Sequence, residues 1–170
     1  MELVVYGVLC QREEERETAY RLLAFMLERE YGLKSFPRLV RAPGGKPFFP
    51  SRPDLQFNLS HSRGAAVCAV HNESLGVDVE RLRPAPRRLA KGLDDEAFFR
   101  LWTAKEATIK RQGLGIAALL EPLEPDPLCQ CLENFLPGWI VTVCPSEAVS
   151  IRTQRVERQD LTADTFAVYL

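Results

Sequence analysis

The chain has 170 residues, of which 46% are hydrophobic and 26% charged, and its formal net charge is −1 at pH 7. This length and composition fit one domain, or two small halves packed closely together, with a substantial core. A net charge near zero excludes a global basic field that would attract nucleic acid or membrane, so any phosphate binding has to be local.

The N-terminus and the cysteines indicate where the protein works. MELVVYGVLC lacks the basic start and the length of a secretory leader, and no apolar run is long enough to cross a bilayer. The cysteines are odd in number and show no metal-binding spacing, while Cys129 and Cys131 are spaced like strand neighbours on one face. We therefore expect a cytoplasmic protein with neither nucleic acid nor membrane as a partner. We also expect reduced thiols at Cys10, Cys68, Cys129, Cys131 and Cys144.

The first half predicts a strand, a long helix, a loop and two further strands. The helix would open on acidic side chains, carry apolar residues at helical spacing, and stop before Gly32. A loop rich in proline and glycine follows it. The predicted elements are a strand at Leu3–Leu9, a helix at 13–31, and strands at Asp54–Ser60 and Gly64–His71.

The second half predicts a similar order. A strand precedes a basic segment broken by prolines, and Asp94 is a suitable N-cap for a helix that would end at Gly113. We expect the buried side of this helix to include Phe98, Leu101, Trp102 and Ile109. The predicted strands are Leu75–Glu80, Leu128–Leu132, Gly138–Cys144, Val149–Thr153 and Thr165–Leu170.

The repeated element order predicts an α+β fold of two similar halves, residues 1–74 and 75–170. Each half would be a small antiparallel sheet packed on one long helix. A crevice between two such halves is a natural place for a ligand.

Two acidic motifs predict a metal site. Asp78 and Glu80 are two residues apart, so on a strand both carboxylates point to one face. Glu106 and Lys110 are four apart and share one face of a helix. Three carboxylates at one place repel one another and need a cation, and oxygen ligands favour Mg²⁺ with substrate phosphate in the open positions. The plainer alternatives are the solvated face of an edge strand and an exposed helical ion pair.

Four motifs in this order resemble those of the 4′-phosphopantetheinyl transferases: GGKP at 44–47, FNLSHS at 57–62, GVDVE at 76–80 and WTAKEATIKRQGLGI at 102–116. The surfactin-synthetase-activating type, a single-chain pseudodimer, is the nearer match, and the shorter trimeric holo-carrier-protein synthases are a poorer one. The resemblance spans about residues 16–145. It implies the fold of that family and favours a monomeric pseudodimer.

The resemblance implies an enzyme that moves the 4′-phosphopantetheine arm of coenzyme A to a serine of an acyl or peptidyl carrier protein. The other product would be 3′,5′-ADP, and the pathway would be fatty acid, polyketide or nonribosomal peptide synthesis. In this reading Asp78, Glu80 and Glu106 hold Mg²⁺, and Lys110 touches a phosphate oxygen. Glu106 would also help to remove the serine proton.

The resemblance also implies where coenzyme A binds. Ser60 and His61 would lie at its phosphates, with Gly45 and Lys46 near its adenosine. The plainer alternatives are an ordinary turn histidine for His61 and a solvated loop lysine for Lys46. Lys105 offers no basis for choosing between solvent and phosphate.

The chain departs from the family's pattern in two places. Members of this type usually carry a basic helix before the first long helix, and its lysines help to hold the 3′-phosphate. Here the first strand runs almost directly into the helix at 13–31, and the segment Arg81–Leu93 is shorter than in the family. The candidate replacements at the 3′-phosphate are Arg16, Arg21, Arg38 and Arg41.

These departures keep two other functions open. One is a catalytically weak module that binds coenzyme A or a carrier protein, and the other is a subunit completed in trans by a partner. The basic stretch Arg81–Lys91 is either a solvated face or a docking surface for an acidic carrier, through Arg83, Arg87 and Arg88.

Overall fold

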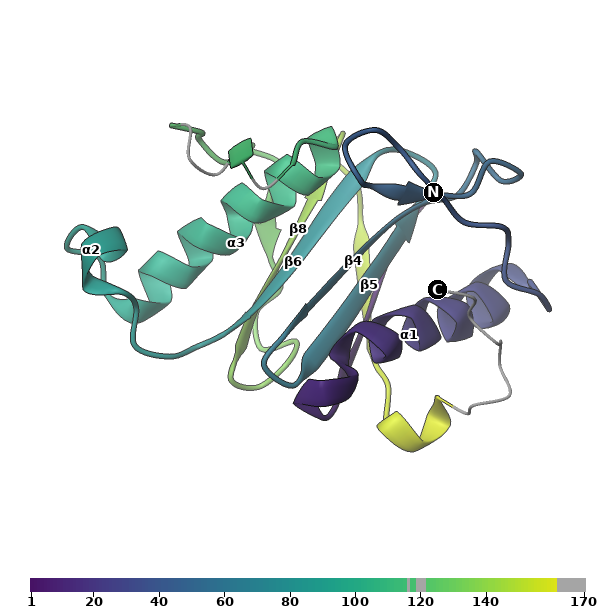
Figure 1. Cartoon of the computed structure of the whole chain (residues 1–170), viewed down its shortest axis with the longest axis horizontal. Coiled ribbons are helices and arrows are strands. Elements are labelled where there is room, and N and C mark those ends of the chain that lie inside the picture. Colours follow the sequence, from purple (N-terminus) through teal and green to yellow (C-terminus); the bar gives the residue numbers. More distant parts are fainter. Residues whose placement is uncertain (116, 119–121, 162–170) are drawn as a thin grey trace.

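The computed structural model describes residues 1–115, 117, 118 and 122–161, so the strand predicted at 165–170 lies outside it. Two sheets lie side by side, with a long helix on the outer face of each (Figure 1). This arrangement confirms the predicted α+β class. In the part of the chain that is described, no helix is both long and apolar enough to cross a membrane.

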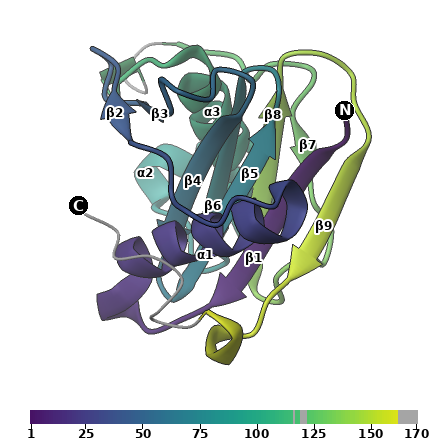
Figure 2. The ribbon, with the colours of Figure 1, turned by 90° about the vertical axis from the view of Figure 1, so that its right-hand side faces the viewer.

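The first sheet has the strand order β4-β5-β1-β9. Its members are β1 (Leu3–Leu9), β4 (Gln56–Ser62), β5 (Ala65–His71) and β9 (Ile151–Arg155). The pairs β4–β5 and β5–β1 are antiparallel, whereas β9 runs parallel to β1 along the sheet edge (Figure 2). A strand that follows residue 150 therefore completes the sheet that the first half begins. The division at residue 74 stays a prediction.

Helix α1 (Glu15–Tyr31) covers the outer face of this sheet, and a short 3₁₀ helix, η1 (Arg12–Glu14), leads into it. It ends as predicted at Gly32, which takes a left-handed conformation with φ of 65°. Leu22, Met26 and Leu27 on its inner face are fully buried against Tyr6 and other residues of the first sheet. The predicted helix at 13–31 is thus confirmed apart from its 3₁₀ start.

Strand alternation explains why β1 and β5 are almost wholly apolar. Val4 and Tyr6 face α1, while Leu3 and Val5 face the other way, into a second core shared with the second sheet. Because both faces of these strands are covered, both sets of side chains have to be apolar.

The second sheet has the order β6-β8-β7 and is antiparallel throughout its described pairs. Its strands are β6 (Leu75–Arg81), β7 (Gln130–Cys131) and β8 (Trp139–Pro145). The prediction of a strand over Leu128–Leu132 was too long, because Cys129 N donates 2.9 Å to Asp126 O in a turn before β7.

Helix α3 (Asp95–Gln112) packs on the outer face of this sheet. Asp94 caps it as predicted, accepting from Ala97 N at 2.8 Å, and Gly113 ends it. Its inner face carries Phe98, Phe99, Thr103, Ala107, Thr108 and Ile109. The prediction that Leu101 is buried was wrong, since its side chain is 37% exposed, and Trp102 is only partly covered.

Four short elements complete the description. Strands β2 (Val40–Arg41) and β3 (Pro47–Phe48) form a small hairpin that carries the GGKP loop. Helix α2 (Arg87–Ala90) is one turn within the basic segment, and η3 (Arg158–Asp160) follows β9.

Candidate functional site

A polar seam joins the two sheets where β4 runs beside β6. Three side chains of β4, from Asn58, Ser60 and Ser62, point to β6 because they alternate on one face of the strand. Val77 N donates 2.9 Å to Asn58 Oδ1, and Val79 N donates 3.3 Å to Ser60 Oγ. These side chains give β6 backbone groups the partners that a neighbouring strand would otherwise supply.

Asp78, Ser60 and Lys110 meet at the centre of this seam. Lys110 Nζ donates to Asp78 Oδ1 at 2.6 Å, to Ser60 Oγ at 2.9 Å and to Val77 O at 3.2 Å. Ser60 Oγ donates in turn to Asp78 Oδ1 at 2.8 Å. Three residues from β4, β6 and α3 that were predicted as site residues are therefore in direct contact.

Gly76 allows α3 to approach β6 at this point. A Cβ atom built on Gly76 would lie 1.9 Å from Ala107 O and 2.7 Å from Arg111 N, distances that no side chain tolerates. Because the helix and the strand approach so closely here, Lys110, one helical turn after Ala107, reaches the Asp78 carboxylate on β6.

Asp78 is a buried carboxylate whose bonding is incomplete. Its residue is 5% exposed, and burial raises its pKa although the charge of Lys110 opposes the shift. Oδ1 accepts from two donors, whereas Oδ2 has no hydrogen-bond partner among the described residues. A buried oxygen left in this state is a position where a ligand is expected.

Glu106 lies in the same electrostatic environment. Its pKa is raised to about 7, chiefly by burial and then by the charges of Asp78 and Glu80, while the charge of Lys110 opposes the shift. Glu106 is therefore balanced between its charged and neutral forms near neutral pH, which suits a group that takes up a proton.

Glu80 is held slightly apart from this pair. Its Oε2 accepts 3.0 Å from Ser62 Oγ and 2.8 Å from an Arg83 guanidinium nitrogen. Among the described residues, no three His, Cys, Asp or Glu side chains are arranged as a metal site. The oxygen-only donors and the unpartnered Asp78 Oδ2 fit a hard cation, but Lys110 and Arg83 now neutralise two of the three acids.

Lys46 lies at the edge of the seam with a different set of partners. Its Nζ donates to Leu75 O at 2.9 Å, Arg111 O at 3.3 Å and Ser74 Oγ at 3.5 Å. Burial, with a contribution from Arg111, lowers its pKa to about 8. Lys46 thus ties the GGKP loop to the start of β6 and the end of α3.

A pocket of about 190 Å³ connects this loop with Lys110. The GGKP loop can approach the end of α3 because Gly44 has no side chain. A Cβ atom at this position would lie 2.1 Å from Gly113 O and would clash with it. Three predicted site residues line the pocket. Its lining is Gly44, Gly45, Lys46, Pro47, Asn58, Leu59, Lys110, Gly113 and Leu114.

His61 does not join the cluster. It follows Ser60 on β4 and so points to the opposite face, where its Nδ1 lies 3.3 Å from Glu15 Oε2 at the start of α1. The other oxygen of Glu15 accepts from Gly64 N at 2.5 Å. The His61 side chain is exposed, and it lies beside the Glu15 carboxylate.

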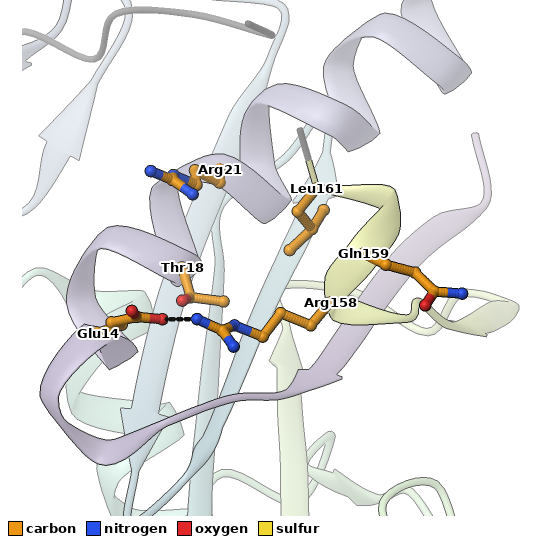
Figure 3. Close-up of a pocket in the computed structure, with 6 residues that line it drawn as sticks. All are labelled: Glu14, Thr18, Arg21, Arg158, Gln159 and Leu161. Carbon is orange, nitrogen blue, oxygen red and sulfur yellow. Dashed lines mark hydrogen bonds and ion pairs between the residues drawn. The ribbon is translucent and has the colours of Figure 1, made fainter. Parts of the chain in front are cut away.

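A second pocket, of about 450 Å³, lies beside the first turns of α1 and η3 (Figure 3). Arg158 and Glu14 in it are ion-paired, and Arg21 pairs with Glu17 at 2.5 Å. Both arginines therefore already have an acidic partner. Its lining shares no residue with the Lys110 pocket and consists of Glu14, Thr18, Arg21, Arg158, Gln159 and Leu161.

The candidate replacement Arg41 is nearer to the GGKP loop. It donates 3.0 Å to Gly45 O and 3.3 Å to the Tyr20 hydroxyl. In the basic segment, Arg83 lies over the Phe99 ring at 4.4 Å, whereas Arg87 and Arg88 on α2 are exposed.

Sequence reasoning missed Asn58 and Ser62, which flank Ser60 on the same face of β4. The alternation of polar side chains in FNLSHS was the available signal. It also missed the hydrogen-bonded hydroxyls of Thr103 and Thr142, which lie 2.7 Å apart beside Asp78, the residue opposite Thr142 in the sheet. No signal in a single sequence could have found this pair, because it depends on contact between segments that are distant in the chain.

Comparison with known proteins adds an independent finding. Residues 74–146 match the family model described as the 4′-phosphopantetheinyl transferase superfamily. The chain is 32% identical over 135 residues to the 4′-phosphopantetheinyl transferase Sfp of Bacillus subtilis, covering 66% of this chain and 60% of that protein.

Two further relatives come from other bacteria. The 4′-phosphopantetheinyl transferase HetI of a Nostoc species is 41% identical over 123 residues, or 56% of this chain and 50% of that protein. The 4′-phosphopantetheinyl transferase AcpT of Salmonella typhi is 33% identical over 100 residues, or 48% and 52%. The chain thus spans about half to three fifths of the length of these curated relatives.

Proposed function

Because the chain belongs to the 4′-phosphopantetheinyl transferase superfamily, we propose that it transfers the 4′-phosphopantetheine arm of coenzyme A to a serine of an acyl or peptidyl carrier protein and releases 3′,5′-ADP. The observation that carries this proposal is the contact of Lys110 with the buried Asp78 inside the segment matched by the family model. A partly buried cation held by a buried carboxylate beside a pocket can neutralise charge on a phosphoryl group.

Lys110 would neutralise phosphate charge. Its Nζ is held by Asp78, Ser60 and a backbone carbonyl, so it is already oriented and needs little reorganisation when a phosphate arrives. The pocket between Lys110 and Lys46 gives a phosphate group a place between two cations. Ser60 would contribute its hydroxyl, and Gly45 its backbone, to the same ligand.

Asp78, Glu80 and Glu106 would hold Mg²⁺ against the pyrophosphate. When bound, Mg²⁺ supplies charge neutralisation on the phosphate oxygens. The support is the donor chemistry: a buried oxygen on Asp78 without a partner among the described residues, and a Glu106 whose pKa is raised by burial and by its acidic neighbours. Ser62 and Arg83 would orient Glu80.

Glu106 would accept the proton of the attacking serine. With no metal bound, the pKa of this carboxylate lies near 7, so it takes up a proton at neutral pH more readily than a carboxylate with an ordinary pKa. His61 would contact a coenzyme A phosphate only if its side chain turned from Glu15. A cytoplasmic, monomeric protein stays a prediction.

The test is the mass of an apo acyl carrier protein incubated with this chain, coenzyme A and Mg²⁺. We expect a gain equal to one phosphopantetheine group at the carrier serine. Tight coenzyme A binding without a mass gain would favour the binding module instead. A gain that appears only after a second polypeptide is added would favour a subunit completed in trans.

A further inference from the structure

Cys129, directly before β7, and Cys144 on β8 lie close together. The register pairs Gln130 with Val143, so the residue before Gln130, Cys129, comes opposite the residue after Val143, Cys144. Leu132 N donates to Val141 O at 2.8 Å, so Leu132 and Val141 are a hydrogen-bonded pair. Because such pairs alternate with non-hydrogen-bonded ones along antiparallel strands, Cys129 and Cys144 form a pair without backbone hydrogen bonds between them. Opposed Cα atoms in such pairs are about 4.5 Å apart, within the range that a disulfide spans.

The two thiols also point to the same side. Thr108 Oγ1 on α3 lies 3.3 Å from Cys129 Sγ and 3.9 Å from Cys144 Sγ, so one hydroxyl touches both sulfurs. All five cysteines are free in the structure, so both thiols of this pair are available to react. Figure 2 shows β7 lying along β8 at the edge of the second sheet.

The environments of the two thiols differ in a useful way. Cys129 is partly exposed, whereas Cys144 is fully buried. The hydrogen bond between them lowers the pKa of Cys129 and raises that of Cys144. The accessible sulfur therefore has the greater thiolate character, which is the property that makes a cysteine react with oxidants.

We propose that Cys129 and Cys144 are a reversible redox pair, oxidised to a disulfide by a hydroperoxide and restored by a dithiol reductant. The Cys129 thiolate attacks a peroxide oxygen, which breaks the O–O bond and leaves a sulfenic acid and, for H₂O₂, one water after protonation. The Cys144 sulfur then attacks the Cys129 sulfur, forming the S–S bond and releasing a second water. Two thiols and one H₂O₂ thus give one disulfide and two waters.

The bond would join β8 to the turn that precedes β7. That turn is already fixed to α3, since Asp126 N donates 3.0 Å to Thr108 Oγ1 and Asp126 pairs with Arg111 at 2.5 Å. Oxidation would therefore fasten the turn that contacts Thr108, on the inner face of α3, to the second sheet. This proposal does not rest on the transferase activity.

The experiment is a peptide map of the full chain after treatment with H₂O₂ and blocking of free thiols. Cleavage after Glu106, Glu133 and Glu147, with the Glu121–Pro122 and Glu124–Pro125 bonds left intact, separates peptide 107–133, which holds Cys129 and Cys131, from peptide 134–147, which holds Cys144. We expect the two peptides to be disulfide-linked, and separate again after dithiothreitol.

Cys131→Ser is the matched control, because Cys131 lies two residues after Cys129, on β7, and is opposite Thr142. The linked peptides should persist in Cys131→Ser and fall at least about tenfold in Cys129→Ser and Cys144→Ser. Cys129→Ser, at the partly exposed position, decides the matter if Cys144→Ser does not fold. No linked peptide in the wild-type chain, or a link that survives Cys129→Ser, would overturn the proposal.

Discussion

Asp78 is stabilised as a buried acid by two neighbours that are distant in sequence. Removing a carboxylate from water is costly, and Lys110 and Ser60 offset that cost by direct hydrogen bonds to one oxygen. The second oxygen is left without a partner among the described residues. This asymmetry is the clearest sign, at the scale of a single residue, that the group serves a ligand as well as the fold.

Replacement of this acid should remove metal binding. We expect Asp78→Asn to weaken Mg²⁺ binding at least tenfold in calorimetry with coenzyme A present, because it deletes one of the proposed charged ligands. Glu73→Gln, an exposed acid in the loop before β6, is the control and should bind as the wild type does. Equal Mg²⁺ affinity in Asp78→Asn and wild type would refute the metal assignment.

Glu106 predicts a pH-dependent stability in the absence of metal. Its folded pKa, about 7, lies above the ordinary value of 4.5, so its contribution to stability is fully present below pH 4.5 and is lost as pH rises through 7. In EDTA, Glu106→Gln should therefore gain stability relative to wild type between pH 5 and pH 8. Discounted for partial exposure, the gain is about 1 kcal/mol, or roughly 2–4 °C in Tm.

The check is a series of thermal melts of both proteins across that pH range. A difference in Tm that does not change with pH would show that Glu106 titrates at its ordinary pKa.

Lys46 and His61 should act on coenzyme A binding more than on chemistry. Lys46 lies at the edge of the seam and His61 on the opposite face of β4, and neither contacts Asp78 or Lys110 in the described hydrogen bonds. We expect Lys46→Ala and His61→Ala to raise the KM for coenzyme A by about tenfold with kcat nearly unchanged. Lys34→Ala, an exposed control, should leave both constants unchanged, while a large loss of kcat at saturating coenzyme A would assign the residues to the chemical step.

At the scale of elements, caps and periodicity were strong signals. Asp94, Gly113 and Gly32 mark the ends of α1 and α3 because a capping carboxylate and left-handed glycines act locally. The error at Leu101 has a physical cause: helical spacing alone does not say which of two adjacent apolar stripes faces the sheet. Phe99 and Thr103 occupy the inner face instead.

Some contacts of the candidate site could be predicted from the sequence and others could not, because only local spacing is visible in a sequence. Asp78, Ser60 and Lys110 are brought together as expected, because motif residues at strand and helix spacing can be placed on a face. The Lys46 anchor and the salt bridge of Glu80 with Arg83 depend on how segments fold back on one another, which periodicity does not encode.

The segment with α2 is where a carrier protein should act. Its exposed cations Arg87 and Arg88 would attract an acidic carrier, mainly by raising the association rate, and salt would screen them over about 8 Å. Arg83→Ala/Arg87→Ala/Arg88→Ala should raise the KM for carrier protein several-fold and flatten its salt dependence.

Arg83 also pairs with Glu80, so the double variant Arg87→Ala/Arg88→Ala separates docking from the site. It should keep most of the effect on the carrier and leave coenzyme A affinity unchanged. Arg29→Ala/Lys34→Ala removes two exposed cations at the far end of α1 and serves as the control. A wild-type salt profile in the triple variant would assign docking to another surface.

At the scale of the whole molecule, the two-sheet arrangement creates the site. Lys110 comes from the helix on one sheet and Ser60 from a strand of the other, so the seam exists only when both sheets are packed together. The pairing of β9 with β1 was not predictable, because it joins residues about 150 positions apart and no local pattern specifies such a partner.

The central claim is that the seam between the sheets performs phosphopantetheine transfer. The most direct measurement is the rate of conversion of apo carrier protein to its modified form, followed by mass, with wild type, Lys110→Met and Lys105→Met. Lys110→Met should lose at least about a hundredfold in rate, because it removes the oriented cation at the phosphate. Lys105→Met, on the same helix but without a described contact to Asp78, should stay within about twofold of wild type. Equal rates in wild type and Lys110→Met would contradict the account.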